Sequence, residues 1–188
     1  RLKKKLSPTI PFYFPSFVLN SFSVRAFNFL YFNKQRQKVV KNFIDYETFF
    51  YPLDAINDWN KIYGKGGFIQ YQMVIPKEKG KEGMKKILET IGRSGQGSFL
   101  AVLKLFGKGN PEAYNSFPFE GYTLALDFKI NRELRQLVDN LDKIVEEFGG
   151  RIYLTKDSMS KPSLTNYLKN VDSSKFVSLQ SKRIKRGS

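Results

Sequence analysis

The feature that most constrains the fold is the alternation of strand-like and helix-like segments between Gly66 and Lys156. Short runs rich in β-branched and aromatic residues alternate with two segments whose apolar residues recur at helical spacing. These patterns predict strands at 68–75, 99–106, 122–128 and 151–154, and helices at 84–91 and 134–148. The order β-α-β-β-α-β is that of the ferredoxin-like plan. We therefore expect an α+β fold with an antiparallel sheet, both helices on one face, and the first and third strands in the centre.

The helix boundaries are predicted from capping residues. Asn131 can cap the second helix, and Gly149 with Gly150 supplies a left-handed stop after it. Gly92 and Gly95 are expected to end the first helix. The second helix has the stronger pattern, and its apolar positions are Leu134, Leu137, Val138, Leu141, Ile144, Val145 and Phe148.

Side chains alternate between the two faces of a strand, so the sequence also predicts what each face of the sheet carries. The apolar set expected to meet the helices is Ile69, Tyr71, Met73, Ile75, Tyr122, Leu124, Leu126 and Phe128. The set expected on the opposite face is Gln70, Gln72, Thr123, Ala125 and Asp127. Lys104 and Phe106 share one face of the second strand, and the polar lysine favours the glutamine side.

The glutamine-bearing face has two interpretations. It is either polar because water covers it, or it is a wall that binds a ligand. Glutamine is a poor strand former, so two glutamines in mid-strand favour the second interpretation. An RNA-recognition domain has the same strand order, but Gln70 and Gln72 stand where its base-stacking rings are required. Glu120 also stands where the third-strand motif of that class has a basic residue.

Composition limits the possible chemistry. The chain has no Cys and no His, which excludes Cys/His metal sites, thiol nucleophiles, Ser-His-Asp triads and a covalent flavin link through either residue within this chain. The formal net charge is +15. Basic runs at 1–5 and 182–186 carry four positive charges each, which leaves +7 for the residues between them. This excess favours an anionic partner: nucleic acid, an acidic membrane or a phosphorylated substrate.

Residues 1–45 form an aromatic-rich arm in which Val24, Phe27 and Tyr31 could make one helical stripe. Its most apolar stretch, 12–32, contains Pro15 and Arg25, so no transmembrane span is predicted. We expect a cytoplasmic protein, or one bound peripherally at a bacterial inner membrane, where the arm could meet the lipid surface.

A series of short motifs resembles the C-terminal half of bacterial FAD-linked oxidases of the vanillyl-alcohol oxidase type. They are FFYPLD at 49–54, WN at 59–60, YG at 63–64, GFIQYQMVIP at 67–76, SFL at 98–100, LKLFG at 103–107, SFP at 116–118, RIY at 151–153 and KDS at 156–158. The resemblance covers about 19–158 and is strongest to members that oxidise a polyprenyl-phosphate-linked pentose. The C-terminal domain of aldonolactone oxidases is similar at a greater distance.

The resemblance implies a substrate domain whose sheet covers the flavin ring, while another domain holds the FAD non-covalently. Residues 1–45 would be an arm or linker from that flavin-binding domain, 46–160 the substrate domain, and 161–188 a C-terminal tail. No glycine-rich loop opening a helix precedes the sheet, and Gly64–Gly67 leads into a strand instead. We therefore expect this chain alone to bind no FAD tightly and to be inactive.

The resemblance also implies roles for individual residues. Lys156 would be catalytic, by orienting the reacting hydroxyl, stabilising developing charge or acting as a base, and with Gln70 it would contact the flavin. The implied substrate-binding residues are Gln72, Lys104, Phe106, Thr123, Ala125 and Tyr153. Close relatives carry Asn and Cys where this chain has Thr123 and Ala125, which changes the polarity of the pocket.

The function implied is oxidation of a sugar hydroxyl, at C2 of a polyprenyl-phosphate-linked pentose in cell-envelope arabinan synthesis, by hydride transfer to FAD. The partners implied are a flavin-binding domain or chain, the lipid-linked sugar and a membrane surface. Three alternatives stay open: the C-terminal domain of an aldonolactone oxidase, a non-catalytic remnant that binds a partner, and a nucleic-acid-binding module.

Overall fold

The computed structural model describes residues 7–159, apart from positions 16, 19, 52–54, 111, 113–115, 154 and 157–158 and the side chains at 21, 48 and 99. The chain divides into two units, Arg1–Gly67 and Phe68–Ser188. The functional division into an arm at 1–45, a substrate domain at 46–160 and a tail at 161–188 stays a prediction, and the tail lies outside the described residues.

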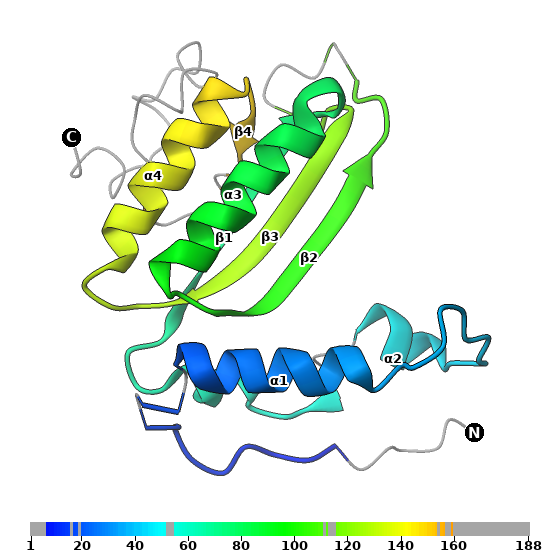
Figure 1. Cartoon of the computed structure of the whole chain (residues 1–188), viewed down its shortest axis with the longest axis vertical. Coiled ribbons are helices and arrows are strands. Elements are labelled where there is room, and N and C mark those ends of the chain that lie inside the picture. The colour runs from blue at the N-terminus through cyan, green and yellow to red at the C-terminus, as the bar shows by residue number, and fades with distance from the viewer. Residues whose placement is uncertain are drawn as a thin grey trace. The chain divides into compact units, whose positions relative to one another are not determined.

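The second unit has the predicted β-α-β-β-α-β order (Figure 1). Its elements are β1 (Phe68–Pro76), α3 (Gly80–Ser94), β2 (Ser98–Phe106), β3 (Gly121–Lys129), α4 (Leu134–Glu147) and β4 (Arg151–Ile152). The strands form one antiparallel sheet in the order β2-β3-β1-β4, so the first and third strands are central. Both helices lie on the same face of the sheet. The predicted α+β fold class is confirmed.

The hydrophobic core fills the space between the sheet and the two helices. In the register of the central pair, Tyr71 lies opposite Leu126. Met73 lies opposite Leu124, and all four side chains are buried. They pack with the apolar faces of the helices, which contribute Met84, Ile87, Ile91, Leu134, Leu137, Val138, Leu141, Ile144 and Val145. The predicted helix-facing side of the sheet is therefore confirmed.

A buried hydrogen bond joins the sheet to α4. The Tyr71 hydroxyl donates to Asp142 Oδ1 at 2.7 Å, and both residues are buried. Burial of a carboxyl group is costly unless hydrogen bonds compensate it. This contact therefore fixes the position of α4 on β1.

The ends of the helices follow from local chemistry. Asn131 Oδ1 accepts from the backbone N–H groups of Glu133 and Leu134 at 3.1 and 2.9 Å, so the predicted cap lies one turn before α4. After α4, Gly149 has φ +70° in the left-handed region, as predicted.

The prediction that Gly92 ends the first helix is wrong, since α3 continues to Ser94. The prediction for Gly95 is confirmed, because this residue, with φ +70°, follows the last helical residue. A glycine ends a helix only where the backbone takes a left-handed conformation, and the sequence does not reveal which of two nearby glycines does so.

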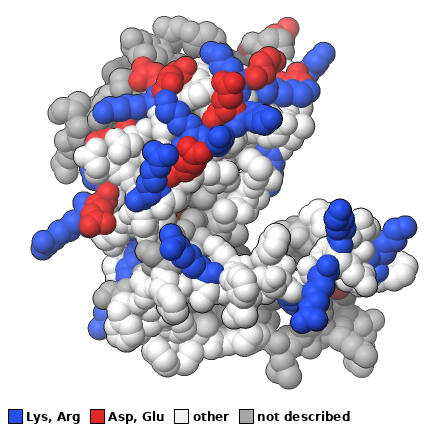
Figure 2. All heavy atoms as spheres, in the orientation of Figure 1, with Lys and Arg blue, Asp and Glu red and all other residues white. Residues whose placement is uncertain are grey.

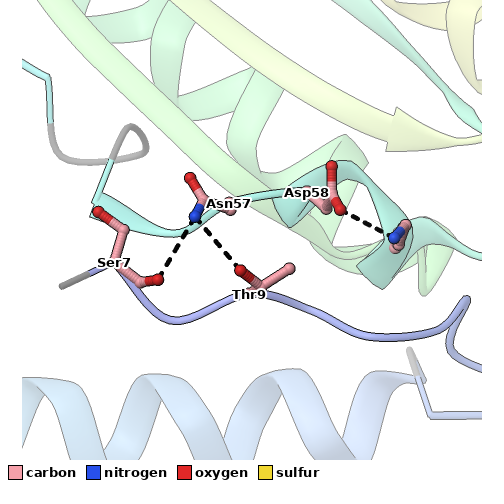
Figure 3. Close-up of polar contacts among 5 residues, drawn as sticks. Ser7, Thr9, Asn57 and Asp58 are labelled. Atoms are coloured by element: carbon pink, nitrogen blue, oxygen red, sulfur yellow. Dashed lines mark hydrogen bonds and ion pairs between the residues drawn. The ribbon is translucent and has the colours of Figure 1, made fainter.

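In the first unit, the segment after position 7 runs beside the residues that lead into a 3₁₀ turn at Trp59–Tyr63. Asn57 joins the two segments: its Nδ2 donates to Ser7 O at 3.4 Å and to Thr9 Oγ1 at 3.2 Å (Figure 3). Next to it, Asp58 pairs with Lys61 at 2.8 Å. These polar contacts give the unit its local order.

The same unit contains α1 (Ser21–Asn33) and α2 (Tyr46–Phe50). Asn20 begins α1, because its Oδ1 accepts from the N–H groups of Phe22 and Ser23. The predicted stripe is helical, but Phe27 is 51% and Tyr31 69% exposed. Among the described residues, no helix has the length and apolar character needed to cross a membrane.

The start of α3 provides a test of core packing. A β-carbon at Gly80 would overlap the Tyr122 ring, whereas one at Gly92 would meet no atom within 4 Å. We expect Gly80→Ala to lower the free energy of unfolding of the chain by about 1–3 kcal/mol through overpacking. We expect Gly92→Ala in the same helix to raise it by about 0.5–1 kcal/mol. Urea denaturation measures both, and equal effects of the two substitutions would contradict the packing described here.

Candidate functional site

The predicted site residues of the strands lie together on the face of the sheet opposite α3 and α4. In the register, Gln70 lies opposite Asp127, and Gln72 opposite Ala125. Residues directly opposite each other share a face. We call this surface the polar face, and the residues that the sequence analysis assigned to it are Gln70, Gln72, Lys104, Phe106, Thr123, Ala125 and Asp127.

The register also assigns the face of Lys104, which the sequence pattern left open. Lys104 lies opposite Thr123 on β3, so it belongs to the polar face as favoured from the sequence. Gln72 Nε2 donates to Thr123 Oγ1 at 3.1 Å from the other neighbouring strand. Thr123 is 1% exposed, and Lys104 is exposed. An amide and a hydroxyl are therefore hydrogen-bonded on this face, and a lysine on the third strand lies opposite the hydroxyl in the register.

Aromatic rings adjoin this polar group. The Phe117 ring contacts Phe106 edge-on at 6.0 Å between centroids and Tyr153 at 4.7 Å. The Tyr153 backbone N–H donates to Gln72 O at 2.8 Å, which ties this ring to β1. Phe106 and Tyr153, both predicted from the resemblance, are thus brought together by a third ring.

Phe117 was not predicted as a site residue, although it belongs to the SFP motif at 116–118. Its loop is held in place by Arg151, whose guanidinium donates to Ser116 O at 2.8 Å and lies over the Phe119 ring at 5.0 Å. Phe117 is buried, so a motif that carried only the family resemblance supplies part of the site wall.

Asp127 is the most unusual group on the polar face. It is 1% exposed, and its Oδ2 has no hydrogen-bond partner among the described residues. Burial raises the pKa of the Asp127 carboxyl, while a hydrogen bond with Gln70 and the charge of Lys156 act in the opposite direction. The sequence placed Asp127 on this face but gave it no role, because alternation along a strand does not reveal burial.

Lys156 lies in the turn that follows β4, and its side chain is exposed. Its backbone N–H donates to Tyr153 O at 3.1 Å. Its positive charge acts to lower the pKa of the Asp127 carboxyl, against the larger effect of burial. Lys156 thus follows Tyr153 at the end of the strand that borders β1, while its catalytic role stays a prediction.

The opposite side of the second unit differs in character. Lys and Arg alternate with Asp and Glu over α3 and α4 (Figure 2). Lys86 on α3 pairs with Glu147 on α4 at 2.7 Å, and Lys85 and Glu89 lie 3.9 Å apart on the same helix. Such exposed pairs are typical of a solvated helix surface. The candidate site is therefore the polar face.

The polar face fits contact with a flavin ring or a sugar better than it fits a pyrophosphate. Amide and ammonium donors suit the ring oxygens and nitrogens of a flavin and the hydroxyls of a sugar. The glycines at the start of α3 make no phosphate cradle, because Gly80 accommodates Tyr122 and Gly83 accommodates Phe148. Within the described residues, no cluster of three acidic side chains that could hold a metal ion occurs.

Comparison with known proteins adds to this geometry. Over 153 residues the chain is 43% identical to decaprenylphosphoryl-β-D-ribose oxidase of Mycolicibacterium smegmatis, a match that covers 80% of this chain and 32% of the oxidase. The predicted resemblance to FAD-linked oxidases is therefore confirmed. The chain spans about a third of the length of this relative, which is consistent with likeness to one of its domains.

A second relative is an uncharacterized protein from the mprA 5′ region of Streptomyces coelicolor. It is 33% identical over 82 residues, which is 43% of this chain and 22% of that protein. No protein-family profile matches the chain.

The burial of Asp127 generates a prediction about pH and stability. Because the pKa of the Asp127 carboxyl is raised in the folded state, the folded protein keeps the carboxyl proton over a pH range in which the unfolded chain has released it. Stability from this group is therefore lost as the pH rises from the ordinary value of 3.8 through the raised value. Each unit of the shift corresponds to about 1.4 kcal/mol.

We expect the free energy of unfolding of Asp127→Asn to rise relative to that of the unchanged chain across this pH window, because the amide does not ionise. Urea denaturation of both proteins, from below pH 3.8 to neutrality, measures the difference. A difference that is independent of pH would contradict the buried, raised carboxyl.

Proposed function

We propose that this chain is the substrate-binding half of an FAD-dependent oxidoreductase that oxidises a sugar hydroxyl. The substrate class is a polyprenyl-phosphate-linked pentose, oxidised at C2. The observation that carries the proposal is the gathering of Gln72, Lys104 and Thr123 on one face of the sheet, in a chain 43% identical to decaprenylphosphoryl-β-D-ribose oxidase. The FAD is held mainly by a flavin-binding domain or chain that covers the polar face.

Different residues of the polar face can bind different parts of the substrate. Gln72 and Thr123 offer hydrogen bonds to sugar hydroxyls, and the exposed ammonium of Lys104 suits the phosphodiester. Phe106 and Tyr153, joined through the Phe117 ring, provide an apolar wall for the sugar ring.

The chemistry is a two-electron oxidation. The C2–H bond would break with its electron pair, the hydroxyl would release its proton to water, and a ketone would form. A bound flavin would supply the hydride acceptor. Lys156 orients the 2-hydroxyl or stabilises the charge that develops as the proton leaves, while Gln70 contacts the flavin ring. Ala125, opposite Gln72 in the register, leaves room beside these groups.

The proposed location of the protein in the cell follows from the substrate. A lipid-linked sugar is reached from a membrane surface, and the first unit presents exposed aromatic side chains such as Phe22, Phe29 and Phe32. Basic residues follow α1 at Lys34, Arg36 and Lys38. We place the protein in the cytoplasm or peripherally at a bacterial inner membrane, where apolar and basic groups together favour an anionic lipid surface.

The first test concerns the cofactor. The 188-residue chain purified alone should lack the visible absorption of FAD, because no phosphate cradle occurs among the described residues. Adding the FAD-loaded remainder of the M. smegmatis oxidase should restore substrate-dependent bleaching of the flavin. A yellow chain with stoichiometric FAD would contradict the division into two halves.

The second test concerns Lys156. In the reconstituted enzyme, Lys156→Ala should lower the rate of flavin bleaching by polyprenyl-phosphoryl ribose about 100-fold or more, because it removes an ammonium group from the reacting centre. Lys86→Ala, which removes an exposed ammonium from α3, is the matched control and should leave the rate unchanged. Equal rates for the two variants would contradict the proposed role.

Bleaching by a free aldonolactone instead of the lipid-linked sugar would identify an aldonolactone oxidase.

A further inference from the structure

The edge strand β2 leaves one side of its backbone without a partner strand. In the sheet order β2-β3-β1-β4, β2 has a neighbour on one side only among the described residues. Alternate N–H and C=O groups of an edge strand point away from the sheet, where they form a template for another strand. The opposite edge, β4, has only the two residues Arg151–Ile152, whereas β2 has nine. The edge of β2 is therefore the place where this sheet can be extended.

Two exposed leucines lie along the edge of β2. Leu103 lies opposite Leu124, which belongs to the core beneath the helices. Leu105 lies opposite Tyr122 and therefore shares that side of the sheet. Both leucines are more than half exposed. The reason is that α3 lies over the central strands and leaves β2 uncovered (Figure 1).

A third leucine extends this apolar surface from α3. Lys86 pairs with Glu147 on α4, so the side of α3 that carries Lys86 faces α4. A residue two positions further along a helix is turned by about 200°. Leu88 therefore lies on the side of α3 away from α4, which is the side of β2, and it is more than half exposed (Figure 1). We call Leu88, Leu103 and Leu105 the leucine strip.

The edge of β2 lacks most of the features that keep edge strands from pairing with other chains. Natural edge strands are shielded by proline, by charged side chains, by bulges or by being short. β2 has no proline and no acidic residue, and it pairs regularly with β3 from Ala101 to Phe106. Its lysine, Lys104, lies on the polar face and not on the side of the leucines. A long edge beside exposed apolar side chains indicates an interaction surface.

We propose that the flavin-binding domain or chain adds an extended segment to the outer edge of β2, as a fifth strand of the sheet. The backbone of this segment pairs with the outward N–H and C=O groups of β2. Its apolar side chains, at alternate positions, cover the leucine strip. The proposal rests on the proposed function, because it takes the partner from the other half of the same enzyme.

Two observations favour this occupant. β2 also carries Lys104 and Phe106 of the polar face, so a strand at its edge is continuous with the surface that the flavin-binding half is proposed to cover. The match covers 32% of the M. smegmatis oxidase, so most of that relative lies outside it and can supply the segment. A second copy of this chain fits less well, because two chains with a net charge of +15 each repel one another.

The experiment follows hydrogen–deuterium exchange of the β2 amides in the full 188-residue chain by ¹⁵N NMR, with and without the FAD-loaded remainder of the M. smegmatis oxidase. The β2 amides that point away from β3 should exchange rapidly in the free chain. In the complex their exchange should be slower by about tenfold or more. The amides of β1, which has a strand on each side, should be protected in both states and serve as the reference.

A substitution tests the leucine strip in the same chain. Leu103→Lys should weaken the binding of the remainder by about tenfold or more, because an ammonium group would have to be buried under the added strand. Leu105→Lys is a second variant with the same expected effect, and both side chains are exposed in the free chain. Gln136→Lys, which places a lysine on the exposed surface of α4, is the matched control and should leave the affinity unchanged. Isothermal titration calorimetry measures the three affinities.

The outcomes separate this proposal from the proposed function. Unchanged exchange of the β2 amides in a complex that is bleached by the lipid-linked sugar would overturn the added strand and leave the proposed function intact. Protected β2 amides in a complex that is never bleached would support the strand and contradict the proposed function. The absence of any complex would overturn both.

Two further results would overturn the added strand. Equal affinities for Leu103→Lys and Gln136→Lys would show that the leucine strip is not covered in the complex. β2 amides that are already protected in the free chain, together with the mass of a dimer in sedimentation, would identify a second copy as the occupant.

Discussion

The pairing of β1 with β3 is the interaction on which the rest of the structure depends. Nine residues of each strand are aligned without a break, from Phe68 opposite Lys129 to Pro76 opposite Gly121. A shift by one residue would exchange the two faces, because side chains alternate along each strand. The large apolar side chains on one side demand burial under α3 and α4, so the register is fixed by the core. The polar face is the other consequence of the same register.

This dependence explains why so much could be predicted from the sequence. The strand order and the helix-covered face follow from periodicity, and the positions of Gln70 and Gln72 follow from the alternation alone. Asn131 and Gly149 mark real helix boundaries, because their preferred conformations are local. From periodicity alone this face could be described only as polar. The resemblance to FAD-linked oxidases is what suggested that it contacts a flavin and a sugar.

The features that could not be predicted depend on contacts between distant segments. The burial of Asp127 does not follow from its position along the strand. The arrangement of Phe117 between two other rings arises only once the 116–119 loop and the chain after β4 are folded. The end of α3 at Gly95 instead of Gly92 reflects one backbone conformation. Along α1 the apolar spacing indicated one helical stripe, but it could not show that Phe27 and Tyr31 are exposed, since spacing shows which residues share a face and not what covers them.

The central claim is that the polar face contacts a flavin held by another polypeptide segment. The most direct measurement is ¹⁵N NMR of the glutamine side-chain amides during titration with the FAD-loaded remainder of the M. smegmatis oxidase. The account predicts that the signals of Gln70 and Gln72 shift, while that of Gln136 on α4 stays in place. A shift of Gln136, with Gln70 and Gln72 unchanged, would contradict it.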